Sequence, residues 1–169
     1  SKKGIDFAHQ TGVKLIIILD CGIKAIQEIE YAKSLGIDFI ICDHHVPDDV
    51  MPPAVAILNP KRPDDPFPFK HLCGCGVGFK FMQAFAKNNN IPFSRLIPLL
   101  DFCAVSIAAD IVPVVDENRI LAFHGLKLLN TNPSIGLKSI IDICGLNGRE
   151  LSMSDIVFKI GPRINASGR

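Results

Sequence analysis

The sequence has no tryptophan, a single tyrosine and no pair of cysteines at CxxC spacing. Without such pairs, the six cysteines do not predict a structural zinc site. The formal net charge of +1 predicts no overall attraction to nucleic acid, although a local basic groove is compatible with it. No apolar run approaches the roughly 20 residues of a membrane span, and no signal peptide follows Ser1. These absences favour a cytoplasmic protein with no membrane partner.

The chain is rich in apolar residues. Its 169 residues are 48% hydrophobic, which is enough for one domain with a proper core. Most of the cysteines lie among Ile, Val, Leu and Phe, where a thiol packs as a small apolar side chain. We therefore expect mostly buried free thiols, which are typical of proteins from a reducing compartment.

Residues 1–60 predict a strand–helix–strand unit. The run 13–19 is apolar at every position but one, which predicts a fully buried, central and parallel strand. Apolar positions at helical spacing predict a helix over 23–35, and a second strand follows over 37–42. Crossovers of this kind are right-handed, so the two strands lie parallel in one sheet. The same portion contains a short predicted helix at 4–11 and a third predicted strand at 54–59.

Residues 61–169 predict a mainly helical portion. The segment 74–78 opens one helix, and its glycines permit either close packing, which we favour, or a phosphate cradle that lacks the GxxxxGK[ST] pattern. The other predictions are helices over 93–109, 117–130 and 134–145, and a loop over 159–169. The fold class is therefore α/β: a parallel β-sheet flanked by helices, with a mainly helical second half.

Carboxylates follow both predicted strands of the strand–helix–strand unit. Because Asp20 and Asp43 are the first residues past these strands, parallel pairing brings both to one sheet edge, about 5 Å apart if the strands are neighbours. Two such carboxylates repel each other unless a cation lies between them, and His44 adds a nitrogen donor. Asp110 ends another apolar run. The sequence therefore predicts a divalent metal site, although the triplet with His45 taken alone also fits a turn or a structural hydrogen bond.

Five ordered segments resemble the DHH phosphoesterase superfamily and, within it, the RecJ family of single-strand-specific exonucleases. The segments are 19–22, 43–45, 74–80, 107–113 with 117–119, and 161–169. Together they extend the resemblance from about residue 5 to the end of the chain. Such an ordered set is far more specific than the Asp-His-His triplet.

The resemblance implies a two-metal phosphodiesterase, with Mn²⁺ or Mg²⁺, that digests single-stranded DNA from the 5′ end in DNA repair and recombination. The implied metal ligands are Asp20, Asp43, His44 and Asp110, with Asp20 or Asp43 bridging the two ions. Asp43 and Asp110 are also implied to be catalytic together with His45, which either contacts the scissile phosphate or orients a ligand.

The resemblance also implies a phosphate-binding set near the end of the chain. Arg163 would hold a DNA phosphate with its planar fork of donors, helped by Asn165 and Arg169, and the alternative for Arg163 is a salt bridge within the loop. The implied macromolecular partners are single-stranded DNA and either a single-strand-binding protein or a helicase.

The sequence departs from the family pattern at both ends. No Asp-x-Asp motif precedes Asp20, and the smaller substrate-binding domain and oligonucleotide-binding module of the family do not follow residue 169. We therefore expect a partial catalytic domain that binds metal weakly and has little nuclease activity alone. Two rivals stay open: another enzyme of the superfamily, such as an oligoribonuclease, a cyclic-dinucleotide phosphodiesterase or a pyrophosphatase, and a replication scaffold without catalysis.

Overall fold

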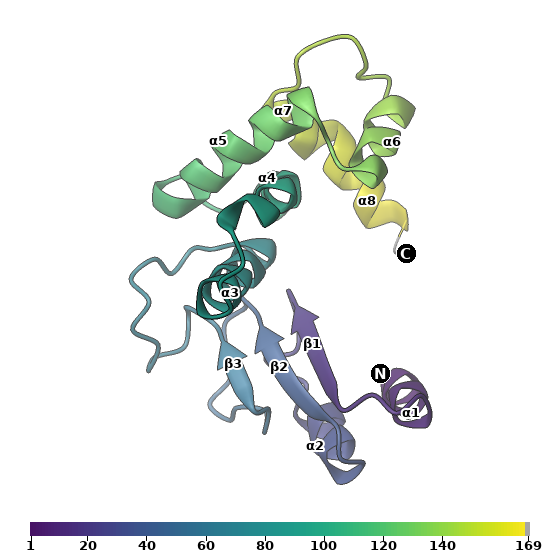
Figure 1. Cartoon of the computed structure of the whole chain (residues 1–169), viewed down its shortest axis with the longest axis vertical. Helices are drawn as coiled ribbons and strands as arrows, with labels where there is room; N and C mark the ends of the chain where they lie inside the picture. The colour runs from purple at the N-terminus through teal and green to yellow at the C-terminus, as the bar shows by residue number, and fades with distance from the viewer. Residues whose placement is uncertain (168–169) are drawn as a thin grey trace. The chain divides into compact units, whose positions relative to one another are not determined.

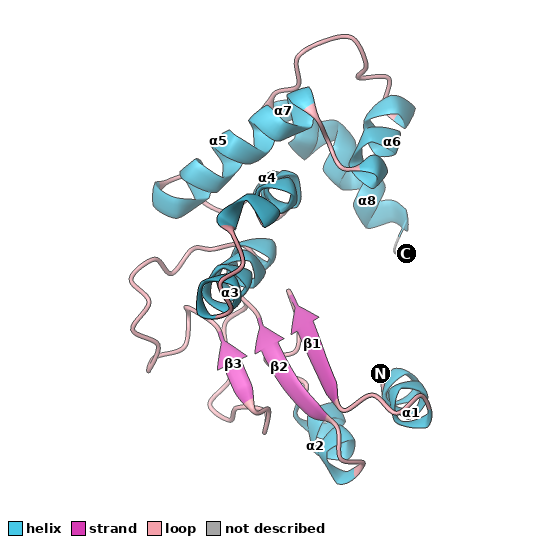
Figure 2. Cartoon of the chain, in the orientation of Figure 1, coloured by secondary structure: helices cyan, strands magenta, loops and turns pink. Residues whose placement is uncertain are grey.

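The computed structural model describes residues 1–167, which form parts of two compact units. The N-terminal unit covers residues 1–70, and the C-terminal unit begins at His71. Figure 1 labels the elements, and Figure 2 shows that the strands all precede the long run of helices. The elements are α1 (Lys2–Gln10), β1 (Leu15–Leu19), α2 (Ile26–Ser34), β2 (Asp38–Cys42), β3 (Ala56–Leu58), α3 (Gly74–Asn88), α4 (Leu100–Ala109), α5 (Asp116–Thr131), α6 (Ile135–Ile143), α7 (Met153–Asp155) and α8 (Gly161–Ser167).

The N-terminal unit is a parallel three-stranded sheet in the order β1-β2-β3. The strand–helix–strand prediction and the third strand are confirmed, and the chain has the predicted α/β class. Helices α1 and α2 supply Ile5, Ala8, Ile29 and Ala32 to a core cluster that also contains Phe39 and Ile41 of β2. The helices therefore cover the face of the sheet to which Phe39 and Ile41 point.

Strand β1 is not the fully buried central strand that its composition predicts. It lies at one edge of the three strands, and its residues alternate between exposed and half-buried. Ile16 and Ile18 pack against the core cluster, whereas Leu15, Ile17 and Leu19 point to the other face and are 45–50% exposed. A run that is apolar at every position predicts burial on both faces, but helices α1 and α2 cover only one.

The C-terminal unit is built around α4. Seven of its ten residues are buried, as the nearly continuous apolar sequence predicts. The predicted helix over 93–109 begins with two 3-10 turns, Phe93–Arg95 and Ile97–Leu99, before α4 itself. Helix α5 approaches α4 so closely that a Cβ on Gly125 would lie 2.1 Å from the carbonyl oxygen of Leu100. Gly125 is therefore required by the contact between these helices rather than by its backbone angles.

The segment 159–169 is not the predicted loop. A π turn, Ile156–Ile160, leads directly into α8, so that Gly161 donates its N–H to the carbonyl of Ile156, five residues earlier. Pro162 lacks an N–H, and its ring disfavours a normal α-helical turn before it. The wider π register accommodates this proline, and the helix continues where Gly-Pro sequences normally stop one.

The six cysteines are free thiols in the structure, as expected. Cys42, Cys73 and Cys103 are buried, whereas Cys75 and Cys144 are half-buried and Cys21 is exposed. Burial raises the pKa of both the Cys42 and the Cys73 thiols to about 11. In the described residues no helix combines the length and the apolar character needed to cross a membrane.

Asp155 anchors the start of the last helical segment. The Arg149 guanidinium, the N–H and hydroxyl of Ser152, and Lys159 hold the pKa of its carboxyl far below the usual range. A lowered pKa in the folded state stabilises the protein above the unfolded value of about 3.9, and this contribution is lost as the pH falls through the folded value.

Asp155→Asn should therefore lower the urea midpoint at pH 7, with the difference from wild type shrinking as the pH drops below about 4. Urea unfolding followed by circular dichroism between pH 7 and 2 measures this. Asp142→Asn, at an exposed position of α6, is the matched control. A difference between wild type and Asp155→Asn that does not change with pH would contradict the assigned charge effect.

Candidate metal centre

Polar residues follow all three parallel strands directly. In the register of the sheet Leu19 pairs with Cys42 and Cys42 with Leu58. Asp20 then donates its N–H to the Cys42 carbonyl at 2.8 Å, and Asp43 donates its N–H to the Leu58 carbonyl at 3.0 Å. Asp20 and Asp43 therefore lie at the carboxyl edge of the sheet, which is where open parallel sheets hold their ligands.

Asp20 sits in an unusual backbone conformation. Its φ is +64°, in the left-handed region that residues other than glycine seldom adopt. Its carboxylate is 46% exposed, and Oδ1 lies 3.0 Å from Nε2 of the buried His44 ring. Strain of this kind persists where the surrounding structure enforces it, and here it turns an exposed carboxylate toward an imidazole.

Asp43 is 1% exposed and is held by donors from its own surroundings. Oδ2 accepts the N–H of Ile23 at 2.9 Å, while Oδ1 accepts the N–H of His44 at 2.7 Å and that of His45 at 3.2 Å. The His45 ring nitrogen Nδ1 also lies 2.7 Å from Oδ1. Burial alone would raise the pKa of Asp43, but these hydrogen bonds outweigh burial and lower it, so the carboxylate is ionised at neutral pH.

Three side chains at this edge form a set that fits a metal ion. Asp20, His44 and His45 each offer one ligand atom, and these atoms lie within 4.8 Å of one another. The two imidazole rings are in a T-shaped arrangement with centroids 4.6 Å apart. One carboxylate and two imidazoles are common ligands of divalent transition-metal ions. The chemistry of this donor set therefore suits a divalent cation.

In the structure Asp43 acts as a hydrogen-bond acceptor for the protein, and His45 joins the set of possible metal ligands. Both oxygens of Asp43 accept hydrogen bonds from the protein, and one of them orients His45 in the way that carboxylates orient metal-binding histidines. Because Nδ1 of His45 forms a hydrogen bond with Asp43, Nε2 is the ring nitrogen that can bind a metal ion. The ligand role of Asp43 and the catalytic role of His45 stay predictions.

The other predicted site residues belong to the C-terminal unit. Asp110 follows α4, is exposed, and accepts a hydrogen bond from the Ser106 hydroxyl at 3.2 Å. Arg163 and Asn165 are exposed on α8 rather than in a loop. Arg169 lies outside the described residues. The roles of these four as ligands or phosphate contacts stay predictions.

Asn59 is a site residue that sequence reasoning missed. It follows β3 directly and is 1% exposed. Its Nδ2 donates to the His45 carbonyl at 2.8 Å, and its Oδ1 accepts the Lys61 N–H at 2.9 Å. Asn59 thus fixes the backbone of the histidine that Asp43 orients through its ring. The sequence feature that could have predicted its role is its position: Asn59 is a polar residue at the end of the third predicted strand, as Asp20 and Asp43 are at the ends of the first two.

A hollow of about 540 Å³ lies beside this edge of the sheet. Its lining includes Cys21, Gly22, Asp43 and His45. Gly22 has φ +103°, and a Cβ there would lie 2.1 Å from Cδ1 of Ile18. The Ile18 methyl could move aside, but a residue with a Cβ adopts this φ only under strain, so the turn in the wall of the hollow favours glycine.

Comparison with known proteins identifies the group to which this site belongs. Residues 2–107 match the DHH family, N-terminal domain. The chain belongs to the DHH family. This DHH-family chain is 38% identical over 179 residues to the single-stranded-DNA-specific exonuclease RecJ of Escherichia coli, an alignment that takes in 100% of the chain and 31% of that relative. The RecJ of Bacillus subtilis is 41% identical over 160 residues, which cover 95% of the chain and 20% of that protein.

Solved structures place the DHH-family chain in the same group. The crystal structure of RecJ from Thermus thermophilus in complex with Mn²⁺ matches with a TM-score of 0.82 and 27% identity, covering 99% of this chain and 24% of that one. A crystal structure of exonuclease RecJ bound to manganese matches with a TM-score of 0.77 and 27% identity, over 95% of this chain and 40% of that one. The chain spans about a third, or less, of the two curated relatives.

Proposed function

We propose that this chain carries the metal-binding part of a phosphodiesterase that removes nucleotides from the 5′ end of single-stranded DNA, in DNA repair and recombination. The observation that carries the proposal is the convergence of Asp20, His44 and His45 at one edge of a parallel sheet, with ionised Asp43 behind them. The similarity to exonucleases named as specific for single-stranded DNA supports the substrate, and the manganese-bound relatives support the metal.

Some of these residues would bind the metal ions, and others orient the metal-binding residues. Asp20, His44 and His45 would hold Mn²⁺ or Mg²⁺, with Asp43 and Asp110 as further proposed ligands in a two-metal site. When bound, such ions lower the pKa of a coordinated water and neutralise charge on the leaving oxygen. Asp43 keeps the His45 ring in one orientation, and Asn59 holds the backbone of His45. Arg163 and Asn165 are proposed to bind DNA phosphates.

The setting of the reaction is part of the same proposal. Six free thiols support the cytoplasm, where cysteines stay reduced. Single-stranded DNA is the proposed substrate, and a single-strand-binding protein or a helicase is the proposed partner.

The test compares metal-dependent digestion by the wild type and by variants, in the complete reading frame that contains these residues. Single strands labelled at the 5′ end should release labelled mononucleotides at once with Mn²⁺, whereas strands labelled at the 3′ end should release the label last. Dinucleotide substrates should be cleaved far more slowly. Preferred cleavage of dinucleotides would move the protein to another branch of the superfamily, and Mn²⁺ binding without any hydrolysis would favour a scaffold.

A further inference from the structure

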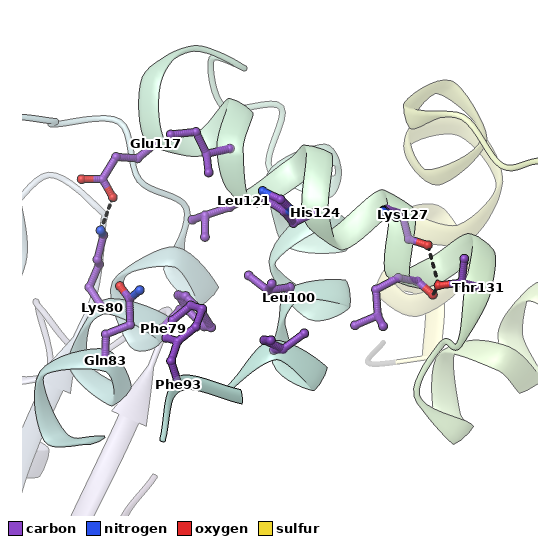
Figure 3. A pocket seen from close by; sticks show the side chains of 13 residues that line it. Phe79, Lys80, Gln83, Phe93, Leu100, Glu117, Leu121, His124, Lys127 and Thr131 are labelled. Carbon is purple, nitrogen blue, oxygen red and sulfur yellow. Dashed lines mark hydrogen bonds and ion pairs between the residues drawn. The ribbon is translucent and has the colours of Figure 1, made fainter. Parts of the chain in front are cut away.

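The C-terminal unit contains a groove that the proposed nuclease chemistry does not use. Its volume is about 740 Å³, and it is lined by residues of α3, the two 3-10 turns, the start of α4, and α5. Figure 3 shows these side chains converging on one hollow from the separate helices. Every lining residue lies between Phe79 and Thr131, so the groove is complete within this unit.

The groove is elongated along α5. The α5 residues in its wall run from Glu117 to Thr131, which at a rise of about 1.5 Å per residue corresponds to roughly 20 Å. A compact small molecule would fill only part of such a length. A helix of about four turns would fill all of it, and an amphipathic helix lying in an apolar groove is a recurrent mode of peptide recognition.

The floor of the groove is apolar. Phe79 and Phe93 meet edge to face with centroids 6.4 Å apart, and Leu100, Leu121 and Leu128 continue the lining. Several of the apolar side chains around it are open to solvent, with Phe93 53% exposed and Ile120 57%. Six of the thirteen lining residues carry hydrogen-bonding groups, but the other seven are apolar and mostly aliphatic, which suits the apolar face of a peptide helix.

The lining of the groove has more positive than negative charge, since it contains two lysines. Among the described residues, Glu117 is the only acidic one in the lining, and it is already paired with Lys80, as the dashed line in Figure 3 shows. At the other end of the groove Lys127 is exposed, and no acidic side chain pairs with its ammonium within residues 1–167. Arg119, beside an adjoining hollow on α5, likewise has no acidic partner in that range. The unbalanced charge favours a ligand with acidic groups.

We propose that this groove is the docking site for an acidic amphipathic helix of a partner protein. The apolar face of that helix would lie over the exposed Phe93, Ile97 and Ile120, and its carboxylates would meet Lys127 and Arg119. The inference does not depend on the metal centre, because the groove and the set Asp20, His44 and His45 share no described residue.

The test is a selection from a display library of 16-residue peptides on the purified protein expressed from the complete reading frame. Selection is run in parallel on the double variant Ile120→Asp/Lys127→Glu, whose substitutions are at exposed positions. Peptides enriched on the wild type alone should have apolar residues at i, i+4 and i+7 and an excess of Asp and Glu. The double variant Ile135→Asp/Lys138→Glu, on exposed positions of α6, is the matched control and should select the same peptides as the wild type.

The affinity of one enriched peptide, measured by fluorescence anisotropy, should fall by about fivefold in Lys127→Glu alone and further in Ile120→Asp/Lys127→Glu. Asp20→Asn should leave this affinity unchanged, which separates the docking proposal from the nuclease proposal. The docking proposal is overturned if no peptide distinguishes the wild type from the groove variant, or if the selected peptides are basic. It is also overturned if oligodeoxythymidine displaces the peptide, or if the groove variant converts a self-associated wild type to monomer in sedimentation equilibrium.

Discussion

Asp20→Asn is expected to remove Mn²⁺ binding and lower nuclease activity by roughly a thousandfold, while the fold is retained. The loss corresponds to several kcal/mol of charge stabilisation by the metal, at about 1.4 kcal/mol for each tenfold change. Asn keeps the polar contact with His44 and is one of the few residues that tolerate the left-handed backbone found at position 20. The unfolding free energy should therefore change by less than about 0.5 kcal/mol.

In the complete reading frame that contains these residues, isothermal titration with Mn²⁺ measures the binding, and release of a 5′ label from single strands measures the activity. Asp38→Asn is the matched control, because Asp38 is an exposed carboxylate at the opposite end of the sheet, at the start of β2. It should bind Mn²⁺ and cleave DNA as the wild type does. Unchanged Mn²⁺ affinity in Asp20→Asn would exclude Asp20 as a ligand.

Asp43→Asn is expected to destabilise the protein itself, by about 2–4 kcal/mol. Both Asp43 oxygens accept hydrogen bonds at 2.7–3.2 Å, three of which come from backbone N–H groups of Ile23, His44 and His45. An amide in its place presents an NH₂ group to some of these donors and removes the charge that they stabilise. The turn after β1 and the two histidines then lose their common anchor, so Mn²⁺ binding should fall as well.

Urea unfolding at pH 7 measures the stability of Asp43→Asn, and the same titration measures its metal affinity. The comparison with Asp20→Asn separates the two carboxylates: one variant loses metal binding alone, and the other loses stability and metal binding together. If Asp43→Asn were as stable as the wild type but unable to bind Mn²⁺, the main role of Asp43 would be metal coordination and not stabilisation of the fold.

Much of this site could be predicted because parallel strands impose a simple geometry. Two apolar runs separated by a helix had to end at the same sheet edge, so the polar residues that follow them, Asp20 and Asp43, had to be neighbours. What each carboxylate does could not be predicted, because it depends on local backbone angles and on the N–H groups that face it. Residue type and spacing contain neither the left-handed φ of Asp20 nor the contact between Ile23 and Asp43.

The failures of prediction have physical causes of a related kind. Strand β1 was expected in the centre because it has Leu or Ile at every position. Such a sequence does not reveal that helices cover only one of its two faces. Asn59 was interpreted only as the end of a strand. Its role in the site depends on a hydrogen bond to the His45 carbonyl, which lies 14 residues away in the sequence and is brought close by the fold. The groove on α5 combines residues of separate helices, so no periodicity within one segment predicts it.

The π turn before α8 makes the placement of Arg163 depend on the register of the preceding turn rather than on side-chain chemistry. A π turn holds one more residue than the α-helical turn it replaces, and each residue of a helix turns the chain by about 100°. Winding the same residues 156–160 in the ordinary α-helical register would rotate Arg163 and Asn165 by roughly 100° about the helix axis, whereas deleting one of them would close the turn and leave both side chains on their present side. The direction in which these side chains point is therefore set by the π register upstream, which absorbs one residue without redirecting either of them.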